Sequence, residues 1–238
     1  MEHCKIVLTT QCNLDCRYCK SHSGNGKMAD RTRILAACRQ AAASGVSRFQ
    51  LAGGEPLLYE DVSGLVGELK AIPGVEWVSL TTNGTLLYPQ LRTLKEAGLD
   101  GINLHLDACD AFTFTNITGK SQLLNEILRG IWGAVAQEIP LTISAVLLED
   151  NAATLAVVAG LAKQYDLTIR FVRAPIQSGE EGPDQKKALE ILSKTIKGME
   201  FDGNAYKAPG LKGSITFGED LWGAFGMEQG GVLSFEEE

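Results

Sequence analysis

The sequence lacks long apolar runs and has a shortage of cations, and both features narrow its class. No stretch approaches the roughly 20 apolar residues that a membrane-spanning helix needs, so a membrane protein is not expected. Lysine and arginine number 22 against 29 aspartate and glutamate residues, which gives a net charge of −7. With this acidic balance, a nucleic-acid backbone is not expected to be the main partner.

The chain also lacks the features of a signal peptide and a low-complexity linker. It begins "MEHCKIVL", which is short and acidic. We therefore expect a cytoplasmic protein, whose thiols stay reduced and serve metal binding or chemistry rather than disulfides. The 238 residues, 45% of them hydrophobic, suffice for one substantial core, so one domain is the expected organisation.

Short strand-like runs alternate with amphipathic stretches along most of the chain. Strands are predicted at 4–9, 47–52, 76–82, 101–107, 141–148 and 167–173. Helices are predicted near 30–44, 61–71, 86–97, 121–138, 152–165 and 184–197. This order favours a parallel sheet with right-handed crossovers, as an open barrel or a doubly wound sheet. A core domain is expected over 1–198, and the Gly-rich extension, 199–238, is expected to form turns and short strands that cover one end.

One face of every predicted strand is polar, because residues two apart in a strand share a face. Its members are Lys5, Val7, Thr9, Arg48, Gln50, Ser79, Thr81, Asn83, Asn103, His105, Asp107, Thr142, Ser144, Thr168 and Arg170. A sheet covered on both sides should be apolar on both. Because buried polar groups are costly unless hydrogen-bonded, polarity on all six strands favours a lumen that binds a polar ligand. The alternative is that these residues bond one another and water.

Three of the six cysteines crowd into the stretch "QCNLDCRYCK". Cys12, Cys16 and Cys19 have the spacing C-x3-C-x2-C, and His22 would complete a tetrahedral zinc site with them. Three thiolates on one loop also suit a [4Fe–4S] cluster, whose fourth iron is then left without a protein ligand. An open coordination site distinguishes a catalytic metal from a structural one. The position at the end of a strand, in a chain with a large core, favours the cluster.

The other three cysteines are scattered along the chain. Cys4 opens the first strand and Cys38 lies in an Ala-rich helical stretch, so both are expected in the core. Cys109 follows the fourth strand and is a candidate catalytic hydrogen-atom donor. The alternative for Cys109 is a packed thiol that behaves as a small hydrophobic residue.

The aromatic residue in "CRYC" makes this motif resemble the signature of radical S-adenosylmethionine (SAM) enzymes. Further motifs follow in order, "LAGGEPLL" at 51–58, "LTTNGTLL" at 80–87, "AGLDGINLHLDA" at 97–108 and "ITGK" at 117–120. Together they resemble the GTP 3′,8-cyclase family of molybdenum-cofactor synthesis, over about residues 4–175.

The resemblance implies an α/β fold, a partial (β/α)6 barrel with a [4Fe–4S] cluster at its open end. SAM would bind the fourth iron and be cleaved by one electron to methionine and a 5′-deoxyadenosyl radical. That radical would abstract hydrogen from a small molecule in the lumen, in a lyase or oxidoreductase reaction. An electron donor such as flavodoxin or ferredoxin is the implied partner.

The resemblance also implies roles for residues near the cluster. Gly53 and Gly54 would let the backbone approach the methionine part of SAM, and Glu55 would pair with its ammonium group. The backbone of Tyr18 would contact the adenine.

Further cofactor contacts are implied on later strands. Thr82 and Asn83 would lie near the cofactor or substrate, and His105 stands where the cyclases usually have a SAM-contacting serine. Ser144 and Arg170 would contact ribose, carboxylate or substrate. For each, the alternative is a lumen residue with a structural hydrogen bond.

Two departures from the cyclases bear on the reaction. The cyclases carry a second cysteine cluster in a C-terminal extension, whereas this sequence has no cysteine after Cys109, so a single cluster is expected. The cyclases also line a triphosphate site with four basic residues. The corresponding positions are Lys5, Arg48, Gln50 and Thr142, and only two of them are basic, so GTP is not the expected substrate.

The substrate is expected to contact those four positions together with Thr81 and Arg173. Arg173 stands where the cyclases have a glutamate and would recognise a carboxylate or a single phosphate, unless it is a solvated rim residue.

The expected activity is therefore that of a single-cluster radical SAM enzyme acting on a small polar metabolite, such as a nucleotide, pterin, amino acid or sugar. The alternatives are a peptide-modifying radical SAM enzyme, an activase that installs a glycyl radical, and a zinc-stapled α/β binding protein.

Overall fold

The computed structural model describes residues 3–19, 26–175, 178–219 and 231–234. Its central feature is a run of parallel strands in sequence order, each paired with the next. These are β1 (His3–Thr9), β2 (Arg48–Gly53), β3 (Trp77–Thr82), β4 (Gly101–His105), β5 (Leu141–Leu147) and β6 (Thr168–Arg173). All six predicted strands are confirmed, and their bounds differ from the prediction by two residues or fewer at each end.

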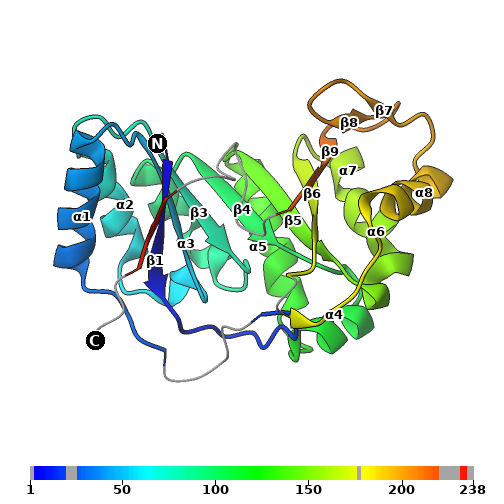
Figure 1. Cartoon of the computed structure of the whole chain (residues 1–238), viewed down its shortest axis with the longest axis horizontal. Coiled ribbons are helices and arrows are strands. Elements are labelled where there is room, and N and C mark those ends of the chain that lie inside the picture. The colour runs from blue at the N-terminus through cyan, green and yellow to red at the C-terminus, as the bar shows by residue number, and fades with distance from the viewer. Residues whose placement is uncertain (1–2, 20–25, 176–177, 220–230, 235–238) are drawn as a thin grey trace.

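Helices connect these strands, as the crossovers of a parallel sheet require. Five of the predicted helices form close to their expected bounds, as α1 (Arg31–Ala43), α2 (Val62–Lys70), α3 (Leu87–Glu96), α5 (Leu124–Ala136) and α8 (Gln185–Thr195). Figure 1 shows α1 and α2 at one side of the strands and α6 and α8 at the other. The single helix predicted at 152–165 is wrong, because that region is divided into η2 (Glu149–Thr154), α6 (Leu155–Ala159) and α7 (Leu161–Gln164).

Two helical segments were not predicted. The first is η1 (Pro56–Leu58), a single turn after β2 whose N-cap residue is Glu55. The second is α4 (Ala111–Thr118), whose sequence "AFTFTNIT" is rich in aromatic and β-branched residues that favour strands. Caps at both ends stabilise α4, since Asp110 accepts from the Thr113 N–H and Gly119 takes a left-handed conformation at the C-terminus.

The tail of the chain extends the sheet at both edges. β9 (Ser214–Gly218) pairs in parallel with β6 and is followed outward by β8 (Tyr206–Lys207) and β7 (Glu200–Phe201). β10 (Gly231–Leu233) pairs in parallel with β1. The described strands of the tail therefore lengthen two edges of the sheet, and they satisfy backbone groups that an open sheet leaves exposed. The division into a core domain and an extension that covers one end stays a prediction. The order β10-β1-β2-β3-β4-β5-β6-β9-β8-β7 is that of an unclosed sheet, a partial barrel.

Strand register separates two faces of the sheet. Apolar residues lie side by side on the outer face, as in the row Ile6, Leu51, Leu80 and Ile102, and they pack against the helices in one core. Cys4 and Cys38 belong to this core, as predicted. Polar residues form rows on the inner face.

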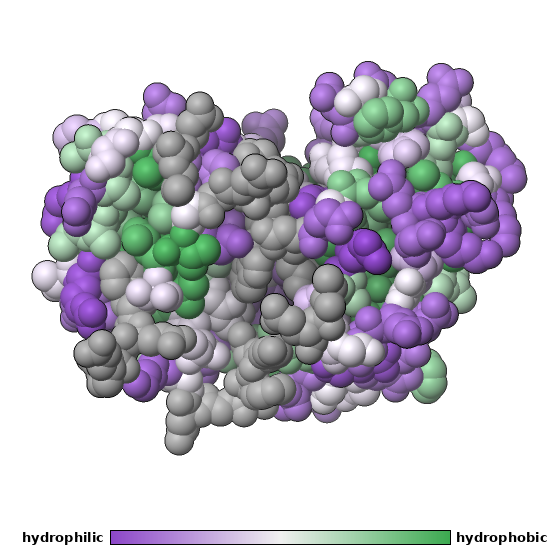
Figure 2. All heavy atoms as spheres, in the orientation of Figure 1, coloured by the Kyte–Doolittle hydropathy of each residue, from purple (hydrophilic) through white to green (hydrophobic). Residues whose placement is uncertain are grey.

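The helices are amphipathic and return their apolar sides to the core. In α8, Ala188 and Leu192 are buried, while the charged residues face solvent and give the hydrophilic surface over this helix in Figure 2. Within the described residues, every helix is too short or too polar to cross a membrane.

Candidate active site

The cysteines lie on the segment that follows β1, residues 10–19, which we call the cysteine loop. It runs past the carboxyl ends of the strands towards α4 (Figure 1). Backbone hydrogen bonds fix its course on both sides. The Glu55 N–H donates to Gln11 O at 2.7 Å, and the N–H groups of Asp15 and Arg17 donate to the last turn of α4 at 3.0 and 3.1 Å.

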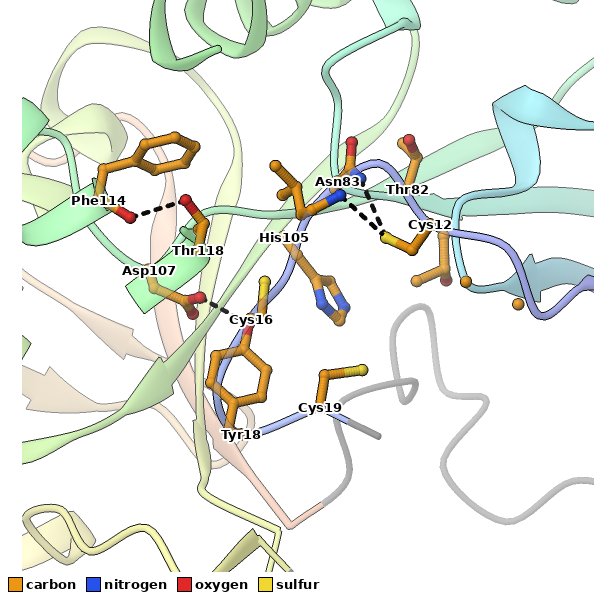
Figure 3. A pocket seen from close by; sticks show the side chains of 14 residues that line it. Cys12, Cys16, Tyr18, Cys19, Thr82, Asn83, His105, Asp107, Phe114 and Thr118 are labelled. Carbon is orange, nitrogen blue, oxygen red and sulfur yellow. Dashed lines mark hydrogen bonds between the residues drawn. The ribbon is translucent and has the colours of Figure 1, made fainter. Parts of the chain in front are cut away.

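Cys12, Cys16 and Cys19 open into one pocket, although they come from different points of the loop. The other described residues that line it are Leu14, Tyr18, Gly53, Gly54, Thr81, Thr82, Asn83, His105, Asp107, Phe114 and Thr118. Figure 3 shows the three cysteine side chains around the imidazole of His105. The pocket therefore joins the cysteine loop to the ends of β2, β3 and β4, where the resemblance expects the cofactor.

The donor set suits an iron–sulfur cluster. None of the six cysteines forms a disulfide, and the three on the loop are partly exposed. Among the described residues, no three His, Cys, Asp or Glu side chains converge as ligands of one metal ion. Soft sulfur ligands suit iron–sulfur chemistry. His22, the fourth ligand of the zinc alternative, lies outside the described residues.

Burial favours the protonated thiol form of Cys12 and Cys16. It raises the pKa of the Cys12 thiol, and burial together with the nearby Asp107 carboxyl raises the pKa of Cys16. Because thiolate is the metal-binding form, binding of a cluster here must release protons.

Gly53 and Gly54 are required by the cysteine loop itself. A Cβ on Gly53 would lie 2.3 Å from Thr9 O, and one on Gly54 would lie 2.2 Å from Gln11 O. The φ angle of 145° at Gly53 also favours glycine. Both residues line the pocket, so a contact with SAM stays a prediction, but their demonstrable role is to let β2 pack against the start of the loop.

Glu55 is fully buried and its carboxylate has three donors around it. Oε1 accepts from Thr82 Oγ1 at 2.7 Å and from Leu57 N at 2.9 Å, and Oε2 accepts from Asn83 N at 2.8 Å. Burial outweighs these bonds and raises the pKa of Glu55 to about 7. Glu55 thus joins η1 to the end of β3 and is not among the described pocket-lining residues. Its predicted pairing with an ammonium group stays a prediction.

Asp107 is a pocket residue that motif reasoning did not assign to the site. Its Oδ2 accepts a hydrogen bond from the Tyr18 hydroxyl at 2.6 Å, and its Oδ1 accepts one from Val146 N at 2.7 Å. Burial raises the pKa of Asp107 to about 6. Its place on the polar face, two residues after His105, was the available signal. The bond ties the last turn of the cysteine loop to the ends of β4 and β5.

The Tyr18 side chain is anchored along its whole length. Its ring packs with Ile117, Val146, Leu148 and Val172. The predicted adenine contact of Tyr18 concerns its backbone, which these side-chain contacts leave untested.

Several predicted residues lie on the inner face but do not line the pocket. Ser144 Oγ donates to Asn103 Oδ1 at 2.6 Å, and Gln50, Thr142 and Arg170 are buried. The guanidinium of Arg170 lies against Gly218, where an added Cβ would come within 2.1 Å of Nη2. Here the inner face is packed.

The remaining predicted residues are not among the described residues that line the pocket. Lys5 and Arg48 are half-buried, and the Arg48 guanidinium stacks on the Trp77 ring at 5.0 Å. Arg173 is exposed and lines a second, polar pocket that also contains Glu180 and Glu181. Cys109 packs against the core, and burial raises its pKa to about 11. For Cys109 this geometry supports the packed-thiol alternative.

Comparison with known proteins connects this geometry to a family. Residues 6–162 match the family model of the radical SAM superfamily. A GTP 3′,8-cyclase of Clostridium perfringens is 32% identical over 235 residues, which cover 91% of this chain and 72% of the relative. A GTP 3′,8-cyclase of Moorella thermoacetica is 36% identical over 179 residues, 72% of this chain and 55% of the relative.

Solved structures share the fold at lower identity. SuiB of Streptococcus suis bound to S-adenosylmethionine aligns with a TM-score of 0.67 at 17% identity, over 94% of this chain and 51% of that one. Methylornithine synthase (PylB) aligns with a TM-score of 0.63 at 17% identity, over 81% of this chain and 62% of that one. This chain therefore spans only about half of SuiB. A family model that matches more than half of the chain, and cyclase relatives above 30% identity, show that it belongs to the radical SAM superfamily, a family of enzymes that use a [4Fe–4S] cluster and SAM.

Proposed function

We propose that this protein holds one [4Fe–4S] cluster through Cys12, Cys16 and Cys19 and uses it to activate SAM for hydrogen abstraction from a small polar substrate. The observation that carries the proposal is the opening of three thiols from one loop, none of them in a disulfide, into a single pocket at the carboxyl ends of the strands. When bound, the cluster supplies the electron that cleaves SAM to methionine and a 5′-deoxyadenosyl radical. Flavodoxin or ferredoxin is the proposed electron donor.

The residues of the chain would orient SAM and exclude water. Thr82 and Asn83 lie on the cluster side of the pocket, and His105 faces the cysteines from β4, where its imidazole can donate or accept a hydrogen bond. The Tyr18–Asp107 bond holds the wall of the pocket next to Cys19. A wall fixed by packing and buried hydrogen bonds keeps the reacting groups in one geometry.

We propose that the substrate carries less negative charge than a nucleoside triphosphate. The curated relatives are named GTP 3′,8-cyclases, but Gln50 and Thr142 are neutral here, and Arg48 is engaged by Trp77. A triphosphate needs several cations to offset its charge. A nucleotide with fewer phosphates, a pterin, an amino acid or a sugar remains consistent with the polar inner face.

Anaerobic reconstitution tests the cluster assignment. The wild-type protein should be brown, contain about four irons and four sulfides per chain, and release 5′-deoxyadenosine from SAM when reduced. Cys16→Ala should lose both the cluster and the cleavage of SAM. Cys38→Ala, the same change at a buried thiol of α1, should retain both. Colourless protein containing zinc, or SAM cleavage by Cys16→Ala, would overturn the proposal.

Isotope transfer tests the substrate class. Deuterium from a labelled true substrate should appear in 5′-deoxyadenosine, and candidates can be compared at equal concentration. We expect no transfer from labelled GTP. Transfer from GTP at a rate above that of every other candidate would show that the substitutions at Gln50 and Thr142 leave a triphosphate site intact.

A further inference from the structure

Asn83 connects the end of β3 to the first cysteine of the loop. Its side-chain Nδ2 donates to Cys12 Sγ at 3.7 Å, a separation suited to the large sulfur atom, and to Asn13 Oδ1 at 2.8 Å. Figure 3 shows the bond between Asn83 and Cys12 at the edge of the pocket. The sulfur also accepts from Leu14 N at 3.5 Å. The Cys12 sulfur therefore accepts hydrogen bonds from two N–H groups of the protein itself.

The orientation of the Asn83 amide is fixed by Thr85. The Thr85 backbone N–H, which can only donate, lies 3.0 Å from one end of this amide, so that end is the oxygen Oδ1 and the nitrogen faces Cys12. Thr85 Oγ1 donates to the same oxygen at 2.7 Å. The usual ambiguity between the two ends of an asparagine is thereby removed.

Asn13 closes these contacts into a ring. Its Nδ2 donates to Thr85 Oγ1 at 2.7 Å, while its Oδ1 accepts from Asn83. Each of the three side chains both donates and accepts within the ring, and such chains of hydrogen bonds strengthen one another. Thr85 is buried, which shields the ring from water. The Asn83 backbone is held separately, by its N–H bond to Glu55.

We propose that Asn83 tunes the reduction potential of the cluster through its hydrogen bond to the Cys12 sulfur, with Thr85 and Asn13 as the positioning residues that aim its amide. The inference rests on the proposed function, because it takes Cys12 as a cluster ligand. Hydrogen bonds to ligand sulfurs are among the factors that set cluster potentials. An N–H dipole aimed at the sulfur favours the added electron, so its loss should make the potential more negative.

This role explains two sequence features together. Asn13 lies between the first two cysteines, and "TNGT" supplies Asn83 and Thr85 from a strand about 70 residues later. The spacer of the cysteine motif therefore has a function of its own, since it receives the amide that serves Cys12.

The test is a redox titration of the reconstituted protein without SAM, followed by electron paramagnetic resonance. Asn83→Leu removes the donor, adds no charge, and keeps the backbone bond to Glu55. Its potential should be more negative than that of the wild type, with cluster content unchanged. Thr85→Val should shift the potential in the same direction by less, because it removes the hydroxyl from the ring while the Asn83 donor and the Thr85 backbone N–H bond remain. Thr85→Ser keeps the hydroxyl and should restore the wild-type value.

Thr93→Val is the matched control, because it makes the same change on the exposed surface of α3 and should leave the potential unmoved. Unshifted potentials in Asn83→Leu and Thr85→Val, with intact clusters, would overturn the inference and leave the proposed function standing. Failure of the wild-type protein to bind a cluster would instead remove the proposed function and the inference with it. If Asn83→Leu does not fold, the Thr85→Val and Thr85→Ser pair decides alone.

Discussion

The two halves of the partial barrel present their inner faces differently. In the first half, β2 to β4, residues at the strand ends line the pocket with the cysteines. In the second half, β5 and β6, Ser144 bonds and Arg170 packs within the sheet. His105 and Ser144 are partners in register, yet His105 faces the cysteines while Ser144 donates to Asn103. The same alternation of polar residues therefore produces pocket-lining residues in the first half and internally packed residues in the second half.

We infer from this contrast that contacts with the cysteine loop determine which inner-face residues form the site. Each strand of the first half has a tie to this loop: Gly54 through the Gln11 backbone, Asn83 through Asn13, and Asp107 through Tyr18. The loop covers these strand ends and creates a pocket beneath it. Three substitutions test this division, and they are given in decreasing order of their predicted consequences.

Gly54→Ala should disturb the first half most. The new Cβ would lie 2.2 Å from Gln11 O, and because that atom is backbone, the start of the cysteine loop must move. We expect a loss of about 2–4 kcal/mol in the free energy of unfolding, by overpacking, and a lower iron content, because Cys12 is the next residue. Urea denaturation and iron analysis measure the two effects.

Gly67→Ala is the control for that change. Gly67 lies in α2, where an added Cβ meets nothing within 4 Å, so the helix should gain about 0.5–1 kcal/mol and iron content should not change. If Gly54→Ala and Gly67→Ala had the same stability and the same iron content, the close approach of β2 to the cysteine loop would not be what holds the site together.

The second change uses the raised pKa of Glu55. Burial raises this pKa from 4.5 to about 7, so the native state favours the protonated acid. The stability that Glu55 contributes is then present below its unfolded pKa and is lost as the pH rises through 7, by up to about 3 kcal/mol. Glu55→Gln is neutral at every pH and lacks this dependence.

Urea denaturation of the metal-free proteins measures the effect. The stability of the wild type minus that of Glu55→Gln should fall between pH 4.5 and pH 7.5. In Glu55→Gln, the NH2 group of the new amide would face the Asn83 N–H, so two donors would oppose each other. This lowers the stability of the variant by an amount that does not vary with pH. The diagnostic quantity is therefore the change of the stability difference with pH. A difference that rises over this range would show that the three hydrogen bonds outweigh burial and that Glu55 is charged in the native protein.

Much of the fold could be predicted from the sequence because its signals are local. The runs "CKIVLT" and "LTISAVLL" predict strands from their own composition, and both form where expected. α4 was missed because its stability comes from caps at Asp110 and Gly119 rather than from helix-forming residues. The pairing of β9 and β10 with opposite edges of the sheet depends on contacts between distant residues, to which no local pattern points.

The candidate site could likewise be predicted where its signals are local, and not where it depends on contacts between distant residues. The motif residues Cys12, Cys16, Cys19 and Asn83 do share a pocket, because each motif ends a strand and parallel strands end at one edge. The interior roles of Glu55 and Asp107 could not be predicted, since they depend on which donors the folded chain brings to each carboxylate.

Ser144→Ala is the smallest change and tests the second half. It removes the donor to Asn103 Oδ1, so we expect a loss of about 1 kcal/mol in the free energy of unfolding and no change in iron content. Calorimetric titration with SAM distinguishes an internal packing role of Ser144 from a contact with the cofactor. Unchanged SAM affinity with reduced stability fits an internal packing role. A large loss of SAM affinity at unchanged stability would instead make β5 part of the cofactor site, as the resemblance to the cyclases implies, and the contrast between the two halves would fail.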